Sequence, residues 1–152
     1  MVMAMQGTAT RPVANDLFQG EGAVAQLVGT RCEGCGSTYF PRALACRNPA
    51  CTRPQVAPTL LSRSGVLYSY TVQTFRPPAL FRMDPWVPYA IGLVELPADR
   101  IRVLGMLGGC ALQDLQIGME LEMDTRVLYR NEDDQHVLTY QFVPKGMAGG
   151  VA

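Results

Sequence analysis

The chain has 152 residues, of which 48% are hydrophobic, and its formal net charge at pH 7 is zero. This length suits one modest domain or two very small ones, and no apolar run reaches the ~20 residues that a membrane-spanning helix needs. Lys145 is the only lysine, and a neutral chain lacks the basic face that binds nucleic-acid phosphates. Because no secretory signal is visible, we expect a soluble, cytoplasmic protein with no membrane partner.

Residues 1–30 are expected to form an N-terminal arm. Within it, Val13, Leu17 and Phe18 have the spacing of one face of a helix. Two glycines that follow them interrupt the apolar pattern. We therefore predict one short helix in this arm, followed by a break.

Four of the five cysteines come next, within Arg31–Thr52, in the spacing C-x2-C-x10-C-x4-C. Two close pairs joined by a short β-prone arm bring four sulfurs around one ion, with each pair on a tight turn. Because all four ligands come from protein, no position is left open for substrate, and such a site is structural. The spacing predicts a rubredoxin-like zinc ribbon with the ligands Cys32, Cys35, Cys46 and Cys51.

Other chemistry is compatible with the same cysteines. A disulfide framework needs an oxidising compartment, and a redox C-x-x-C motif is typical of a strand–helix context that is missing here. An iron site of rubredoxin type uses similar ligands, so the spacing alone leaves iron open. Cys110 lies in an apolar context, Leu-Gly-Gly-Cys-Ala-Leu, which favours a small buried residue over a ligand or a nucleophile.

After a proline-containing linker at 52–58, the pattern changes to β-branched and aromatic residues. Five strands with a short helical insert between the third and the fourth follow the plan of an OB-type barrel. The strands are predicted at residues 65–72, 87–96, 101–107, 120–130 and 136–143, and the helical turn within 111–118.

The fourth predicted strand alternates between apolar and charged residues, so one of its faces is expected to be buried and the other solvated. The predicted buried face carries Leu121, Met123, Thr125, Val127 and Tyr129, and the solvated face carries Glu122, Asp124 and Arg126.

Together these patterns predict a mainly β protein with an N-terminal helical segment, a rubredoxin-like zinc ribbon and a C-terminal five-stranded OB-fold barrel. The predicted boundaries are 1–30 for the arm, 31–58 for the ribbon and linker, 59–146 for the barrel and 147–152 for a tail.

The segment between the first two strands, residues 75–86, has three prolines and an apolar load that is unusual for a loop. We interpret it as a binding surface for a partner or a ligand. The alternative is that the loop folds over the barrel and buries its own side chains. The candidate binding residues are Arg76, Phe81, Arg82 and Trp86.

The charges divide unevenly along the chain. Residues 31–82 carry seven arginines and one acid, whereas residues 83–152 carry five basic residues and ten acidic ones. A zinc ion bound by four thiolates lowers the net positive charge of residues 31–82 by two, and this charge stays positive. A positive ribbon and loop are expected to face an anionic ligand such as a phosphate-bearing cofactor.

Several short motifs carry a resemblance to a known family. These motifs are Leu27–Cys32, Cys35-Gly36, Phe40–Arg42 with Cys46, Gly65–Val72, Pro88–Leu96 and Leu115–Met119. Through them the chain resembles a zinc-ribbon plus OB-fold family of accessory proteins associated with acyl-CoA metabolism, over roughly residues 16–144. The family usually has C-x2-C in its second knuckle, so the four-residue spacer here is a departure that stays within the range of zinc sites.

The resemblance implies a small non-catalytic subunit that binds a thiolase-type enzyme, in a heterotetramer or larger complex, and shares an acyl-CoA ligand with it. Family members also partner acyl-CoA hydratases and retro-aldolases, and this alternative stays open. A nucleic-acid-binding zinc-ribbon and OB module is a further alternative, which the charge balance disfavours. We assign no catalytic residue, because no acid–base pair, activated nucleophile or open metal site can be placed in the sequence.

Overall fold

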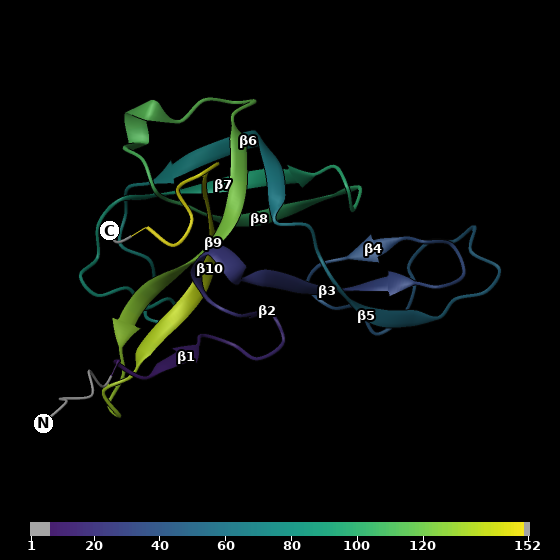
Figure 1. Cartoon of the computed structure of the whole chain (residues 1–152), viewed down its shortest axis with the longest axis horizontal. Coiled ribbons are helices and arrows are strands. Elements are labelled where there is room, and N and C mark those ends of the chain that lie inside the picture. The colour runs from purple at the N-terminus through teal and green to yellow at the C-terminus, as the bar shows by residue number, and fades with distance from the viewer. Residues whose placement is uncertain (1–6, 151–152) are drawn as a thin grey trace, which may run out of the picture.

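The protein, described here by a computed structural model over residues 7–150, is mainly β (Figure 1). The strands are β1 (Thr10–Pro12), β2 (Phe18–Gln19), β3 (Gln26–Cys32), β4 (Thr38–Tyr39), β5 (Val56–Leu60), β6 (Ser64–Gln73), β7 (Tyr89–Leu96), β8 (Ile101–Leu107), β9 (Glu120–Arg130) and β10 (His136–Pro144). Two 3₁₀ helices, η1 (Gly22–Val24) and η2 (Leu112–Asp114), complete the described elements. No helix among residues 7–150 is long and apolar enough to span a membrane.

Strands β6 to β10 form a closed barrel. Their order is β6-β7-β8-β10-β9, and β9 pairs back with β6 to close the ring. Strand β10 runs parallel to β8, while the other pairings within the barrel are antiparallel. The predicted five-stranded OB-type barrel is therefore confirmed. Strands β8 and β9, the third and fourth of the predicted strands, begin and end at the predicted residues.

The ribbon projects from one side of the barrel as a small sheet of β3, β4 and β5 (Figure 1). Strand β5 pairs with β3 from Val28↔Leu60 to Cys32↔Val56. The sequence predicted a linker over 52–58, and this is wrong for residues 56–58, because a local pattern cannot reveal pairing with a strand about 28 residues earlier. The predicted boundary at 58/59 falls inside β5, and the domain boundaries stay predictions.

One hydrophobic core joins the ribbon base to the barrel. Phe142, Leu67 and Met123 are fully buried barrel residues, and Leu27 and Leu61 belong to the same cluster from the ribbon side. Burying a side chain of this size contributes roughly 1.5–3 kcal/mol to stability. The base of the ribbon is therefore held by the barrel core.

The predicted N-terminal helix is wrong. The segment from Val13 to Leu17 consists of bends and turns between β1 and β2. Asp16 has a φ of 63°, which a right-handed helix cannot contain. Strand β1 instead adds to the barrel by pairing in parallel with β10. Residues 1–6 and 151–152 of the predicted arm and tail lie outside the described residues.

The predicted alternation of β9 is confirmed only in part. Asp124, which was predicted to face water, is only 6% exposed. Leu121 and Met123 are buried, but Val127 is 47% exposed and Leu128 only 3% exposed. The pairing of β9 with β10 shifts register between Val137 and Leu138, which leaves Leu128 as the extra residue of a β-bulge that follows Val127. Leu128 is buried because it packs in a second cluster with Met83, Tyr89 and Met106, which the pattern within β9 does not reveal.

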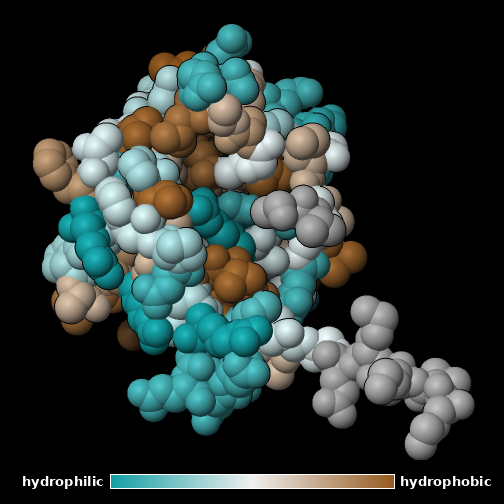
Figure 2. Space-filling view, turned by 90° about the vertical axis from the view of Figure 1, so that its left-hand side faces the viewer, coloured by the Kyte–Doolittle hydropathy of each residue, from teal (hydrophilic) through white to brown (hydrophobic). Residues whose placement is uncertain are grey.

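The outer surface is not uniformly polar. Figure 2, which views the left-hand side of Figure 1, shows apolar side chains in the upper half of this face and mainly hydrophilic ones at its lower end. The described residues include many large exposed apolar side chains, among them Val24, Leu44, Phe75, Leu80, Leu104 and Ile117.

Candidate metal centre and binding loop

The first cysteine pair lies on a tight turn that ends β3. The backbone N–H of Gly36 donates to the carbonyl of Cys32 at 2.8 Å, and Gly36 has a φ of 77° that favours glycine. A Cβ on Gly34 would lie 1.9 Å from the carbonyl oxygen of Arg53. Glycine is therefore required at position 34 for the two knuckles to approach each other.

The second pair has a wider loop, which an Asn-based turn organises. The side-chain oxygen of Asn48 accepts from the N–H of Ala50 at 3.0 Å, and its backbone carbonyl accepts from the N–H of Cys51 at 3.1 Å. Asparagine forms such turns readily because its side chain mimics a backbone acceptor. This turn accommodates the two additional residues and still directs Cys51 toward the first pair.

The four predicted ligands meet at one point. The sulfurs of Cys32, Cys35, Cys46 and Cys51 all lie within 4.8 Å of one another. The Sγ atoms are separated by 3.8 Å for Cys32 and Cys51 and by 3.6 Å for Cys35 and Cys46. Sulfurs at about 2.3 Å from a tetrahedral zinc ion lie about 3.8 Å apart, so the arrangement fits Zn²⁺.

These distances also decide against disulfides in this structure. A disulfide places two sulfurs about 2.0 Å apart, and all five cysteines of the chain, which lie within residues 7–150, are free thiols. Cys110 lies outside the cluster, and burial, followed by the charge of Asp114, raises the pKa of its thiol. Cys110 is accordingly a partly buried thiol away from the metal centre.

The electrostatics of the four thiols favour a cation between them. Hydrogen bonding from Ser37 lowers the pKa of Cys35 to about 6. A backbone hydrogen bond at Arg53 lowers the pKa of Cys51, but burial and the neighbouring thiols of Cys35 and Cys32 raise it to about 12. Four thiols this close cannot all lose their protons without a positive ion, and a bound Zn²⁺ compensates the charge and displaces the remaining protons.

Tyr39 supports this centre, and the sequence analysis missed it. Its hydroxyl lies 3.4 Å from the sulfur of Cys46 and accepts from the backbone N–H of Arg47 at 2.8 Å. The hydrogen bond with Cys46 raises the pKa of the Tyr39 hydroxyl. Groups that orient metal ligands in this way tune the site, and a tyrosine within the arm between the pairs was the available signal.

The four candidate binding residues of the loop between β6 and β7 lie around one cavity. Arg76, Phe81, Arg82 and Trp86 all line this cavity, whose volume is about 210 Å³. The structure thus brings together two guanidinium groups and two aromatic rings, and Asp84, which pairs with Arg82, lines the same cavity. Both kinds of side chain are suited to a ligand with anionic and apolar parts.

Part of the loop packs on the barrel. The ring of Phe81 stacks on that of Tyr89 with centroids 5.6 Å apart, and Phe81 and Trp86 pack against a second buried cluster. Phe75 and Leu80 remain exposed. The loop therefore buries some of its apolar side chains and presents others to solvent. The second cluster consists of Met83, Tyr89, Met106 and Leu128.

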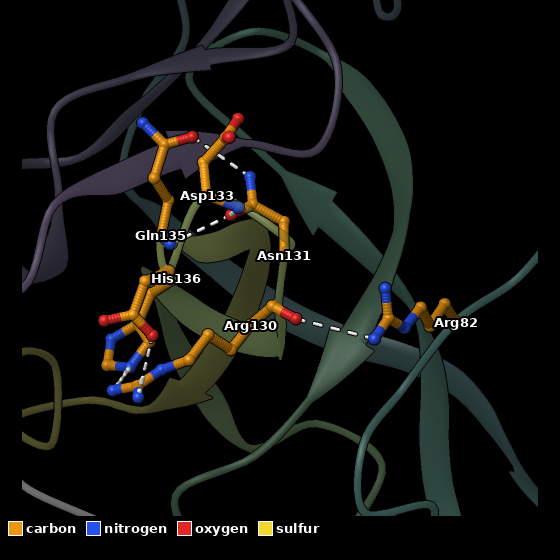
Figure 3. A network of polar contacts seen from close by, with 7 residues as sticks. Arg82, Arg130, Asn131, Asp133, Gln135 and His136 are labelled. Carbon is orange, nitrogen blue, oxygen red and sulfur yellow. Dashed lines mark hydrogen bonds and ion pairs between the residues drawn. The ribbon is translucent and has the colours of Figure 1, made fainter.

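Arg82 connects the loop to the opposite hairpin. Its Nε lies 2.8 Å from Asp84 Oδ2, and its guanidinium lies 4.3 Å from the ring centre of Tyr129. Figure 3 shows Arg82 reaching from the loop toward the backbone carbonyl of Arg130, to which it donates at 3.5 Å. Next to Arg130, the side-chain oxygen of Asn131 accepts hydrogen bonds from the backbone N–H groups of Asp133 and Gln135, and these bonds order the turn between β9 and β10.

Trp86 holds an unsatisfied donor. Among the described residues, its indole Nε1 is the one buried side-chain nitrogen or oxygen atom for which no hydrogen-bond partner is found. A buried donor without a partner costs roughly 1–3 kcal/mol.

Comparison with known proteins identifies the family. The rubredoxin-like zinc ribbon domain of ChsH2 matches residues 21–57, and the C-terminal OB-fold domain of ChsH2 matches residues 59–126. A DUF35 domain-containing scaffold protein of Methanocaldococcus jannaschii is 33% identical over 117 residues, which cover 76% of this chain and 78% of that protein. The chain belongs to the ChsH2 (DUF35) family.

Other members of the ChsH2 family carry more specific names. The benzoylsuccinyl-CoA thiolase subunit BbsA of Thauera aromatica is 30% identical over 122 residues, covering 80% of this chain and 78% of that protein. Among solved structures, the Ltp2-ChsH2(DUF35) aldolase matches with a TM-score of 0.59 and 26% identity, over 78% of this chain and 84% of that chain. The predicted family and its zinc-ribbon plus OB-fold plan are confirmed.

Proposed function

We propose that this chain is a non-catalytic, zinc-containing accessory subunit of a thiolase-type enzyme that acts on acyl-CoA. It contributes to assembly of the complex and to binding of the acyl-CoA. The observation that carries this proposal is the similarity to a thiolase subunit over most of both chains. The cluster of four cysteines supports it, because a metal held by four protein ligands stabilises structure and does not catalyse.

A second candidate function is partnership with a retro-aldolase or an acyl-CoA hydratase. The similarity to the Ltp2-ChsH2(DUF35) aldolase favours this class of partner. In either case the chain supplies the same two features, a ribbon stabilised by metal and a loop with paired arginines and aromatic rings. No specific observation favours a nucleic-acid-binding role.

Within the proposed complex the loop cavity has two functions. Arg76 and Arg82 supply positive charge and fixed donors to the phosphates of CoA. Phe81 and Trp86 supply apolar area to the partner or beside the acyl chain, where buried aromatic side chains often dominate binding. The convergence of all four residues on one cavity supports this assignment.

Replacing Trp86 by alanine is expected to weaken assembly, or acyl-CoA affinity in the assembled complex, by about 2 kcal/mol. Replacing both Arg76 and Arg82 by glutamine should weaken CoA binding more at low salt than at high salt, because salt screens partly exposed charges. Isothermal titration of acyl-CoA into the complex, at two salt concentrations, measures both effects.

The control for these variants is Ile117→Ala, which removes an exposed apolar side chain outside the loop and should leave assembly and affinity unchanged. Thermal melting of the isolated chain completes the test. If Trp86→Ala destabilises the isolated chain by several kcal/mol and leaves assembly and affinity intact, the tryptophan is a core residue and the binding role of the loop is wrong.

A further inference from the structure

The loop cavity is the first of three cavities that share lining residues. Phe81 belongs both to the loop cavity and to a second cavity of about 360 Å³, which is lined mostly by apolar side chains of β7, β8 and β10. Tyr89 belongs both to the second cavity and to a third of about 380 Å³. We call the three together the groove. The second cavity includes Ile91, Leu104, Met106 and Tyr140, and the third includes Leu107, Cys110, Arg126 and Gln141.

Strand pairing places three residues that line the last two cavities, Arg126, Thr139 and Met106, on one side of the sheet. Arg126 of β9 is directly opposite Thr139 of β10, and Gln141 is opposite Met106 of β8. Directly opposed residues project to the same side, as do residues two apart on one strand. Arg126 therefore stands on the same side as Thr139 and Met106, which line the apolar cavity.

The charge of Arg126 is not neutralised within the described part of the chain. The four ion pairs among residues 7–150 use the arginines at positions 42, 82, 102 and 130, and no hydrogen bond from the side chain of Arg126 is found there. Asp124, two residues away, instead accepts from Gln141 Nε2 at 3.1 Å and from Gly149 N at 3.2 Å.

Arg126 is also partly removed from solvent, although the sequence predicted that it faces water. Burial lowers the pKa of its guanidinium, and the nearby Tyr89 raises it. Withdrawing a charge from water without a counter-ion is costly. An anion in the third cavity would compensate this cost, because a guanidinium presents paired donors that match a carboxylate.

We propose that Arg126 binds a carboxylate at the end of the acyl group of an acyl-CoA that lies along the groove. This inference rests on the proposed function. The groove has two arginines in its first cavity, an apolar stretch in its second and one unpaired arginine in its third. An acyl-CoA has phosphates at one end, followed by the pantetheine arm and the acyl chain, so a carboxylate at the far end of the acyl group matches the arginine in the third cavity. The acyl group is therefore that of a dicarboxylic acid.

The test compares succinyl-CoA with butyryl-CoA, which have acyl chains of the same length and differ in the terminal carboxylate. Both esters are titrated into the complex of this chain with its catalytic partner. The wild-type complex should bind succinyl-CoA about 10- to 100-fold more tightly, as expected for hydrogen bonds to a charged group. Arg126→Gln should remove this preference without changing the affinity for butyryl-CoA, and Arg126→Lys should retain part of it.

Arg102→Gln is the matched control. Arg102 lies on β8, which β10 separates from β9 in the barrel, and it pairs with Glu95 at 3.1 Å, so its loss should leave the preference intact. Melting curves for each variant chain verify that it folds.

Equal affinities of the wild-type complex for the two esters would overturn the inference and leave the accessory role standing. If the complex binds neither ester, the acyl-CoA part of the proposed function fails as well. If Arg126→Gln weakens assembly in the absence of any ester and the preference does not change, the carboxylate belongs to the partner, and the inference is likewise overturned.

Discussion

Replacing Cys46 by serine is expected to remove the metal and unfold the ribbon. The wild-type chain should contain about one zinc ion, and the variant should contain none. Zinc binding to sites of this kind is worth roughly 10–16 kcal/mol at pH 7, so a lost ligand removes the main source of order in the ribbon. Metal analysis by mass spectrometry, with the dispersion of amide signals in NMR spectra, measures both effects.

The matched control is Cys110→Ser, since Cys110 lies outside the four-sulfur cluster. This variant should keep its zinc and its ribbon. If the chain contains iron in place of zinc, the four predicted ligands are confirmed and the predicted identity of the metal is wrong. A metal-free preparation of the wild-type chain whose ribbon stays folded would contradict the structural role of the site.

The second large effect is expected at the centre of the barrel. Phe142 is fully buried (0% exposed), and a Cβ placed on Gly105 would lie 3.0 Å from its ring. Replacing Phe142 by alanine leaves a cavity that this tightly packed strand pair cannot fill, so we expect a loss of about 3–5 kcal/mol in the free energy of unfolding. Urea unfolding followed by circular dichroism gives the value.

Leu104→Ala serves as the comparison, because Leu104 lies on the same barrel but is 62% exposed. Its replacement should cost about 1 kcal/mol or less. A similar cost for Leu104 and Phe142 would mean that the described core is not the core in solution.

The sequence was sufficient for features that depend on local chemistry. The spacing of the cysteines alone predicted the four residues that the structure brings together. Strands β8 and β9 begin and end at the predicted residues, because runs of β-branched and aromatic side chains between turn-forming residues are unambiguous.

Other features depend on pairing between distant residues, which no local pattern reveals. Strand β5 forms on β3, across the whole ribbon. The short helix predicted near Leu17 is absent, because the backbone turns at Asp16 and the segment serves two strand pairings instead. The burial of Arg126 could not be predicted for a similar reason, since it follows from how the closed barrel places β9 beside the other strands.

The structure also suggests why ribbon and barrel occur together. Leu27 and Leu61, at the base of the ribbon, share a buried cluster with Phe142 and Met123 of the barrel. The ribbon is thus a projection that is anchored by the metal centre at its tip and by the barrel core at its base. We propose that such a projection fixes the orientation of the loop cavity on the partner.

The most direct test of the accessory role is to purify the untagged chain from its source and identify by mass the proteins that remain bound. The catalytic activity of the complex and of the isolated chain is then measured with acyl-CoA. We expect a thiolase-like partner, turnover by the complex and none by the isolated chain. Thiolysis or hydration of acyl-CoA by the pure chain, abolished by replacing one of its own residues, would contradict the role proposed here.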